Sequence, residues 1–370
     1  MIALATHVKG LLTRGCAEHV FPGACVYVRI GATAFIVEVG CLSYPNGNGS
    51  PPLVSRNTLY DLASLTKVIV TTTAILQLAT AGCVDLNSPI AHYLPDLSPE
   101  AKSRGVTVRH LLTHTAGYPR TGDPTNDLHR SCHTRESVIR RLLEIVPSIC
   151  GVADESSCAY TDFDYLLLGL LVERIAGVTL DTYAEETIFS PLGMRSTTYH
   201  PMGRDRNQIA PTEVSELRGG LVWGEVHDEH AWRMGGVSGN AGLFSSTTDV
   251  GTFCDALLNG WSAPGLPPVA PKFLRALDKQ ISHDRSLAAF GLGWMVNAPF
   301  MGSLGDLSDG PSFGHTGFTG TSIVLNRRLH LAVVLLTNRV HPTRDLSREA
   351  IREYRKLLHD MIAREISSAS

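Results

Sequence analysis

The sequence predicts an α+β fold: an antiparallel sheet flanked by terminal helices, with a helical region inserted between its strands. Three observations carry this prediction. Strand-like runs occur near both ends of the 370-residue chain, the middle has apolar residues at helical spacing, and an amphipathic segment lies at each terminus. Because strands and helices are segregated along the chain, we expect it to leave the sheet, build a helical region and return.

The first strands are expected in a hairpin. Residues 24–30 and 33–39 are β-branched runs separated by Gly31 and Ala32. Residues 1–23 before them lack the apolar core and the small-residue cleavage site of a secretory leader, so we expect an amphipathic helix there.

A second strand pair is predicted at residues 321–325 and 329–337. The segment 342–366 after it has apolar residues at helical spacing behind a polar first turn, which predicts a terminal helix. The chain therefore supplies strands and a helix at each end.

Helices are predicted between the two strand pairs at residues 65–81, 108–113, 136–146 and 162–176. The Pro-rich segment 261–272 and the Gly-rich segment 301–312 are expected to be loops. We expect residues 1–370 to form one unit, with a sheet region at about 1–60 and 285–370 and a helical region at about 61–284.

Composition argues against several classes of partner. The formal net charge is -3 and charged residues make up 18% of the chain, so there is no surplus of positive charge for nucleic acid or an acidic membrane. Nowhere do 18 apolar residues follow one another without a charge. The eight cysteines show no CxxC spacing, and we expect most to be buried thiols. A cytoplasmic protein with no nucleic-acid or membrane partner is the resulting expectation.

One lysine stands alone in an apolar helix. Lys67 is the only charged residue between Asp61 and Asp85, and Ser64 lies three residues before it. A buried ammonium is costly unless it is paired or used, and the spacing puts it on the same face as the Ser64 hydroxyl. A serine hydroxyl becomes an effective nucleophile when a neighbouring base takes its proton. The pair predicts a nucleophile and its activating amine; an N-capping serine with a snorkelling lysine is the structural alternative.

Two later segments add groups of the same kind. Tyr160 stands two residues before Asp162 at the start of an apolar helix, where its hydroxyl could relay protons. His315, Thr316 and Gly317 lie in a strand-like segment whose small residues would let a substrate backbone lie close.

Together, S-x-x-K at 64–67, Y-x-D at 160–162 and H-T-G at 315–317 resemble the ordered signatures of the serine β-lactamase and penicillin-binding protein superfamily. The segments "HLLTHTAGYP" and "HDEHAWRMGGVSGNAGLF" are similar to its class C and esterase-like branch. The resemblance covers about residues 21–338. It implies a β-lactamase/transpeptidase-like fold that forms a single catalytic unit.

The resemblance implies a role for each matching residue. Ser64 would be acylated, Lys67 would activate it, and Tyr160 would shuttle a proton to the leaving group. His315 would orient the substrate and tune Tyr160, and the backbone N–H groups of Ser64 and Phe318 would form the oxyanion hole. The residues implied to bind substrate are Asp162, His315, Thr316, Gly317 and Phe318.

Two residues depart from the family pattern. Asp162 stands where the family most often has Asn, so a carboxylate would raise the pKa of Lys67 and leave it as a fixed charge that lowers the pKa of Tyr160. His315 replaces the Lys of strict β-lactamases, which moves the expectation toward esterase or peptidase relatives. No glutamate of the class A deacylating kind is identifiable, so water activation would fall to Tyr160 and Lys67.

We therefore expect a serine hydrolase that forms an acyl-enzyme on Ser64 with a small ester, amide or peptide substrate. Its activity would be carboxylesterase-like or D-amino-acid peptidase-like, without a cofactor. A class C β-lactamase is one alternative. A non-catalytic module that binds penicillin or peptidoglycan fragments is the other, and the presence of Ser64, Lys67 and Tyr160 together argues against it.

A metal site is the remaining alternative for the histidines. His110 and His114 are four residues apart, and residues 227–230 read "HDEH". Neither cluster has an obvious third ligand and no HExxH pattern occurs, so we expect polar packing and no metal.

Overall fold

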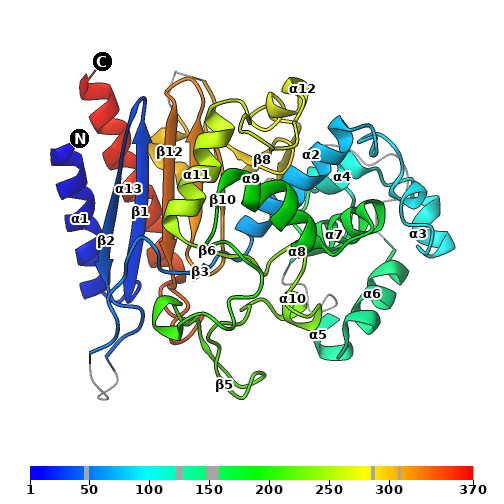
Figure 1. The fold of residues 1–370 in the computed structure, drawn as a ribbon, viewed down its shortest axis with the longest axis horizontal. Helices are drawn as coiled ribbons and strands as arrows, with labels where there is room; N and C mark the ends of the chain where they lie inside the picture. Colours follow the sequence, from blue (N-terminus) through cyan, green and yellow to red (C-terminus); the bar gives the residue numbers. More distant parts are fainter. Residues whose placement is uncertain (46–49, 122–127, 147–157, 285–287, 307–309, 370) are drawn as a thin grey trace.

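The computed structural model describes residues 1–45, 50–121, 128–146, 158–284, 288–306 and 310–369. An eight-stranded antiparallel sheet, in the order β2-β1-β12-β11-β10-β9-β8-β7, runs through it (Figure 1). The strands are β1 (Gly23–Ile30), β2 (Thr33–Gly40), β7 (Ser282–Asp284), β8 (Ala288–Phe290), β9 (Met295–Val296), β10 (Phe313–Thr316), β11 (Ser322–Asn326) and β12 (Leu331–Thr337).

Helices cover both faces of this sheet. The terminal helices α1 (Ile2–Ala17) and α13 (Arg348–Ala369) contact each other, and α1 packs on β1 and β2 (Figure 1). The helix α11 (Thr247–Leu258) packs on β1 and β12, and the larger helical region adjoins it. The alternation along β1 fits these two layers, because Val26 and Val28 join the core under the terminal helices whereas Cys25 and Tyr27 join the other core.

The rest of the chain forms short elements around one long apolar helix, α7 (Asp162–Ala176). The other α-helices are α2 (Thr73–Thr80), α3 (Pro99–Ser103), α4 (Val108–Leu112), α5 (Leu128–Ser131), α6 (Arg135–Glu144), α8 (Leu180–Ala184), α9 (Ser190–Leu192), α10 (Glu229–Arg233) and α12 (Pro271–Leu274). π-Helical turns occupy η1 (Lys67–Thr72) and η4 (Glu185–Phe189), and 3₁₀ turns occupy η2 (Ile90–His92), η5 (Arg206–Gln208) and η6 (Pro299–Leu304). Two small sheets pair β3 (Tyr60–Asp61) with β6 (Phe244–Ser245), and β4 (Val214–Ser215) with β5 (Gly220–Leu221).

The predicted α+β arrangement and its inserted helical region are confirmed, with two local corrections. The predicted loop at 301–312 is wrong at its start, where η6 buries Met301 and Leu304 against α13; residues 307–309 lie outside the described part. The predicted helix at 65–81 contains a π-helical stretch, η1, before α2.

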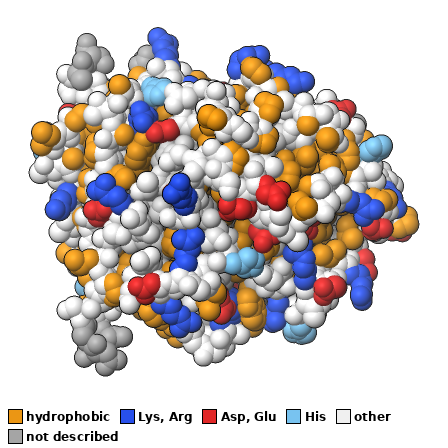
Figure 2. Space-filling model, viewed as in Figure 1, with side chains coloured by type: hydrophobic (Ala, Val, Ile, Leu, Met, Phe, Trp, Pro, Cys, Tyr) orange, Lys and Arg blue, Asp and Glu red, His pale blue; other side chains and the backbone are white. Residues whose placement is uncertain are grey.

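Charged side chains of both signs are spread over the face of the molecule in Figure 2, in keeping with the formal net charge of -3. Within the described ranges, no helix has both the length and the apolar character that crossing a membrane requires. Every cysteine in those ranges is a free thiol.

Candidate active site

Ser64 lies in the tight turn between β3 and η1. The turn places Ala63 at φ 48, a left-handed conformation that costs free energy for a residue with a Cβ. Two buried contacts hold it: the Ala63 N–H donates to Asp61 Oδ1 at 2.8 Å, and the Thr66 hydroxyl donates to the Ala63 carbonyl at 2.7 Å. The turn therefore presents the partly exposed Ser64 just before the first helical residues, where backbone N–H groups favour developing negative charge.

Lys67 reaches back to Ser64 from the first turn of the helix. Its Nζ lies 3.0 Å from Ser64 Oγ, 2.6 Å from Asp162 Oδ1 and 3.0 Å from the Asn240 carbonyl oxygen. The Lys67 side chain is 0% exposed, so these three acceptors replace its hydration. Burial is the largest effect and alone would lower the pKa of Lys67, but Asp162, together with Tyr160 and Asp228, outweighs it and the pKa lies above its ordinary value. Lys67 is thus an ammonium ion, as the sequence predicted from Asp162.

Asp162 is held at the start of α7 by a second neighbour. The Thr121 hydroxyl donates to Asp162 Oδ2 at 3.0 Å and accepts from the Asp162 N–H at 2.9 Å. Burial would raise the pKa of Asp162, but the Lys67 ammonium lowers it below its ordinary value. The carboxylate and the ammonium therefore form a buried ion pair.

Tyr160 approaches the pair from the segment before α7. Lys67 Nζ lies 5.3 Å from the centre of the Tyr160 ring, which also packs against Phe290 at 6.2 Å and His315 at 5.9 Å. Burial raises the pKa of Tyr160, and hydrogen bonds to Ser64 and Lys67 together with the Lys67 charge only partly oppose it. The Lys67 charge lowers the pKa of Tyr160, as predicted, but desolvation is the larger effect and the net pKa stays above its ordinary value.

His315, which lies on β10, carries no charge. It is buried in β10 and its Nδ1–H donates to the Thr316 carbonyl at 2.9 Å. Burial and the nearby Lys67 charge lower the pKa of His315 to about 3, so the ring is neutral near pH 7. Its Nε2 is an acceptor without a partner among the described residues.

The turn after β10 is tied directly to the turn that carries Ser64. The Thr319 hydroxyl donates to the Asp61 carbonyl at 2.7 Å, and the Thr321 hydroxyl donates to the Leu62 carbonyl at 3.0 Å. A Cβ at Gly317 would lie 2.0 Å from Thr321 Oγ1 and 2.5 Å from the Leu62 carbonyl oxygen. Only glycine lets the two segments approach so closely.

The two predicted oxyanion-hole donors, the N–H groups of Ser64 and Phe318, lie on the two turns that these bonds join. Within the described part of the chain, neither the Ser64 N–H nor the Phe318 N–H donates to another group. The Phe318 side chain is 41% exposed and stacks on the His227 ring at 5.6 Å. His227 is fixed in turn, because its N–H donates to Asp61 Oδ2 at 2.6 Å. Asp61 therefore joins the Ser64 turn to the support of Phe318.

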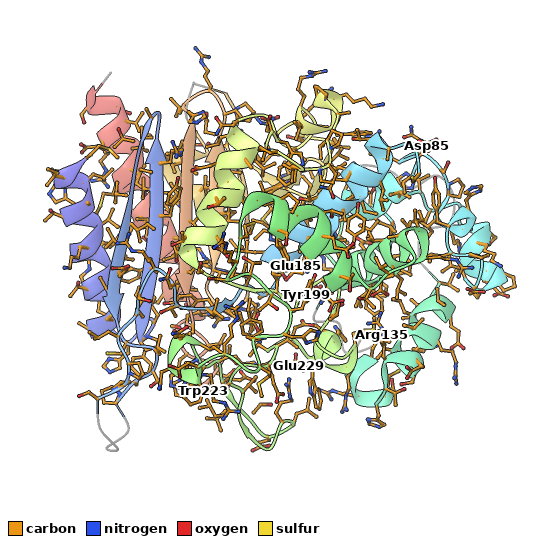
Figure 3. The ribbon with its side chains drawn as sticks, viewed as in Figure 1. Asp85, Arg135, Glu185, Tyr199, Trp223 and Glu229 are labelled. Carbon is orange, nitrogen blue, oxygen red and sulfur yellow. The ribbon has the colours of Figure 1, made fainter. Side chains whose placement is uncertain are left out.

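Ion pairs and a hydrogen bond to the backbone hold the segment around α10 in place. Arg344 pairs with both Glu213 and Glu229, and Arg135 donates to the Met234 carbonyl at 3.0 Å; Figure 3 labels Arg135 and Glu229. The same segment supplies Asn240, whose carbonyl binds Lys67. Arg344 is neutralised here by two carboxylates and stabilises the structure of this segment.

The histidine clusters do not assemble as metal sites in the way their spacing suggested. His110 Nδ1 accepts from the Thr107 N–H, whereas His114 Nδ1 contacts Asp164 Oδ2 at 2.8 Å. His227 pairs with Glu213 at 3.2 Å. Polar packing, the reading favoured from the sequence, describes these three histidines.

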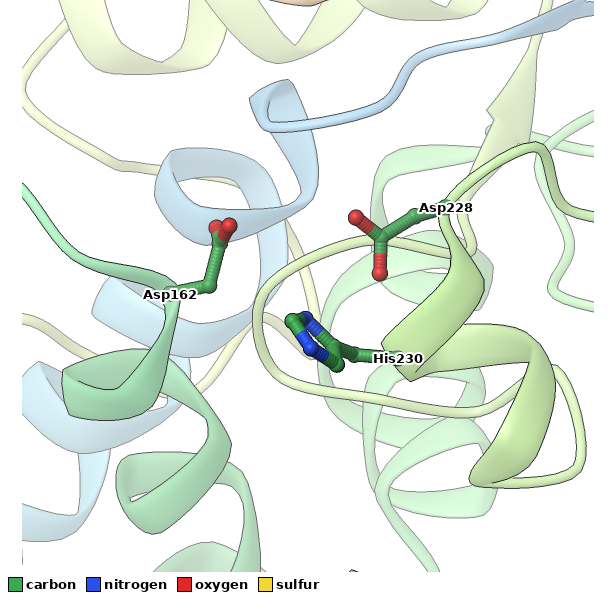
Figure 4. Close-up of side chains that lie close together, drawn as sticks. All are labelled: Asp162, Asp228 and His230. Carbon is green, nitrogen blue, oxygen red and sulfur yellow. The ribbon is translucent and has the colours of Figure 1, made fainter. Parts of the chain in front are cut away.

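One mixed cluster remains beside Lys67. In the described ranges, Asp162, Asp228 and His230 bring their ligand atoms within 4.8 Å of one another (Figure 4). Asp162 comes from the start of α7, and the other two come from the start of α10. The Lys67 ammonium already lies 2.6 Å from Asp162, so a metal ion at this cluster would meet a fixed positive charge.

Sequence reasoning found the motif residues and missed those that hold them. Asn240 acts through its backbone carbonyl, for which no side-chain pattern exists. Asp61 was noted only as the nearest acid before Lys67, yet it binds both Ala63 and His227. The spacing of the acidic residues in the sequence does not indicate that Asp61 makes these contacts.

The fold defines the class: a protein of β-lactamase/transpeptidase-like architecture. The chain belongs to the β-lactamase family, because the model of that family matches residues 8–356. It is 35% identical to a protein of Salmonella agona (strain SL483) named "Putative D-alanyl-D-alanine carboxypeptidase", over 79% of this chain and 72% of that protein. The counterpart from Salmonella heidelberg (strain SL476) is 34% identical over the same shares.

Solved structures share the fold at low sequence identity. A penicillin-binding protein homologue from Pyrococcus abyssi matches with a TM-score of 0.74 at 18% identity, over 95% of this chain and 77% of that chain. A class C β-lactamase matches with a TM-score of 0.74 at 17% identity, over 96% of both chains. Simvastatin synthase from Aspergillus terreus matches with a TM-score of 0.73 at 20% identity, over 98% of both chains. Together with the family match, these likenesses make the chain a serine hydrolase of β-lactamase type.

Proposed function

We propose that Ser64 is the nucleophile and that the protein forms an acyl-enzyme on it with small ester or amide substrates. The observation that carries this proposal is the 3.0 Å contact between Ser64 Oγ and the enclosed Lys67 ammonium, beside the Tyr160 hydroxyl. A serine placed only to cap a helix would have no need of a buried cation at its oxygen.

Acylation would proceed by a relay through Tyr160. As Ser64 Oγ attacks the substrate carbonyl, its proton passes to Tyr160 Oη while the Tyr160 hydroxyl proton moves to the leaving group. A raised pKa suits this role, because Tyr160 never needs to be a phenolate at rest. Lys67 would stabilise the negative charge that develops on the two oxygens.

The carbonyl oxygen would be bound by the N–H groups of Ser64 and Phe318. Such donors act most strongly where charge develops in the tetrahedral intermediate. Deacylation would reverse the relay, with Tyr160 taking a proton from water and returning one to Ser64. Thr316 and Gly317 would align the substrate backbone beside β10, with His315 orienting the substrate and packing against Tyr160.

Charge favours ester or amide substrates over β-lactams. The neutral His315 offers no cation for a β-lactam carboxylate, and Lys67 is matched by Asp162 with Asp228 close by. On charge we therefore place carboxylesterase-like activity ahead of β-lactamase activity. D-amino-acid peptidase-like activity, whose substrate also ends in a carboxylate, is placed ahead of it because of the similarity to the Salmonella protein. The 35% identity to the Salmonella protein favours a D-alanyl-D-alanine carboxypeptidase as the particular peptidase to test.

Intact-mass spectrometry tests the proposal. The protein is incubated separately with a fluorophosphonate, a penicillin, p-nitrophenyl butyrate and a peptide ending in D-alanyl-D-alanine, with Ser64→Ala as the control. We expect a fluorophosphonate adduct on the wild-type chain only, and turnover of the ester or the peptide. An adduct of equal yield on Ser64→Ala would overturn the nucleophile assignment. A penicillin adduct that never turns over, with no turnover of the ester or the peptide, would support the binding module.

A further inference from the structure

His114 lies behind Tyr160 and contacts the chain on both sides of it. The His114 carbonyl accepts from the Ala159 N–H at 2.8 Å, and its Nδ1 accepts from the Thr161 N–H at 3.4 Å. Its ring packs on the Tyr160 ring with centroids 4.6 Å apart. One residue therefore fixes the backbone before and after Tyr160 and supports its ring.

His114 is held in place at a cost. Its backbone adopts φ 56, which is uncommon for a residue other than glycine, and its side chain is completely buried. Strained conformations persist where the surroundings over-determine them, and they cluster at functional sites. Asp164, on the first turn of α7, supplies the main side-chain contact at 2.8 Å.

The contacts of Nδ1 favour one protonation state of this pair. When the Thr161 N–H donates to Nδ1, that nitrogen carries no proton. The 2.8 Å contact with Asp164 Oδ2 is then a hydrogen bond only if Asp164 is the donor, as a neutral carboxylic acid. Burial acts in the same direction, since it raises the pKa of Asp164 and lowers the pKa of His114.

We propose that His114, oriented by the neutral acid Asp164, is a positioning residue that keeps the Tyr160 hydroxyl within reach of Ser64. The inference rests on the proposed role of Tyr160 as proton relay. It adds a residue outside the motifs on which the reaction depends. A misplacement of the Tyr160 hydroxyl by about 1 Å can cost about 100-fold in rate.

A double-mutant cycle on single-turnover acylation by p-nitrophenyl butyrate tests this positioning role. His114→Gly removes the side chain and accepts φ 56 without strain. We expect it to lower the acylation rate about 100-fold in the wild-type background and by less than about threefold in a Tyr160→Phe background. His110→Asn, four residues earlier, is the matched control and should leave the rate unchanged.

Asp164 gives a second measurement that remains available if His114→Gly fails to fold. Asp164→Asn keeps a donor for Nδ1 and should keep the wild-type rate, whereas Asp164→Leu should lose activity. Equal rates for these two variants, or additive losses for His114 and Tyr160, would overturn the positioning role. A fully active Tyr160→Phe enzyme would instead overturn the proposed relay, so the two failures are distinguishable.

Discussion

Two walls of the candidate active site carry different kinds of polarity. The helical wall is formed by the Ser64 turn, η1 and the start of α7, and the sheet wall is formed by β10 and the turn after it. On the helical wall, Lys67 and Asp162 form a buried ion pair that contacts Ser64 directly. On the sheet wall, His315 is neutral, and the Phe318 N–H donates to no other group among the described residues. In the proposed mechanism protons therefore move along the helical wall, and the sheet wall supplies one of the two donors to the substrate carbonyl.

Tyr160→Phe should give the largest effect, because it breaks the relay on the helical wall. General acid–base catalysis contributes about 10²- to 10⁴-fold, so we expect a loss of that size in kcat. The fold should survive, since the ring packing on Phe290 and His315 is retained. Steady-state kinetics with p-nitrophenyl butyrate and thermal unfolding measure the two quantities. Near-wild-type kcat would place the proton chemistry elsewhere.

Gly317→Ala tests the sheet wall. The added methyl group would lie 2.0 Å from Thr321 Oγ1 and 2.5 Å from the Leu62 carbonyl, so the two turns must separate and the Phe318 N–H must move. Loss of one oxyanion donor costs about 10²- to 10³-fold in kcat, and we expect up to that loss without a change in the pH profile.

Gly10→Ala is the matched control for that substitution. Gly10 lies in α1 with no atom within 4 Å of an added methyl group, and alanine favours helices. Its kcat should equal that of the wild type. If Gly317→Ala behaves in the same way, the turn after β10 has no part in binding the carbonyl oxygen.

The sheet side of the molecule was predictable because its signals are local. The hairpin of β1 and β2 follows from two β-branched runs separated by Gly31 and Ala32. The long apolar helix α7 ends at Gly177, whose φ of 72 is the left-handed cap typical of glycine. In contrast, β3 and β6 have two residues each, too few to show alternation. The turn η6 was missed because Gly302 within it and Gly305 after it made the segment look like a loop despite its buried apolar pair.

The candidate site also contains some residues that a local sequence pattern reveals and others that it does not. Ser64 and Lys67 were predicted together because they lie one helical turn apart, and the remaining motifs were found through their resemblance to a family. Asn240 lies 173 residues from Lys67 in sequence, and its contribution is a carbonyl oxygen. The net pKa of Tyr160 depends on how deeply it is buried, which no motif encodes. The sequence therefore predicts the motif residues, whereas packing decides which backbone groups join them and what the net pKa of Tyr160 is.

Asp162→Asn distinguishes two roles for Lys67, a fixed cation and a neutral base. We expect its effect to be moderate. Asp162 raises the pKa of Lys67 against burial, so its removal should lower that pKa. If Lys67 acts as a fixed cation, kcat/KM declines as it loses its proton, and the alkaline limb should move to lower pH in the variant. A shift of the acidic limb to lower pH would instead identify neutral Lys67 as the base. The measurement is the pH profile of kcat/KM for both enzymes.

Chelation should have the smallest effect, and it examines the helical wall at the cluster of Asp162, Asp228 and His230. A cation bound there would lie close to the Lys67 ammonium, which is 2.6 Å from Asp162, and like charges at such distances repel strongly in a buried site. Asp228 is also occupied, because its Oδ1 accepts from the Ala231 N–H at 2.8 Å and from Asn240 at 3.1 Å. We therefore expect EDTA to leave kcat with p-nitrophenyl butyrate unchanged in wild type. A loss that zinc restores would show that the cluster binds a metal, and Asp228→Asn, which keeps the cap of α10, should then abolish the restoration. That outcome would also require Lys67 to give up its proton, which would undo the contrast between a charged and a neutral wall.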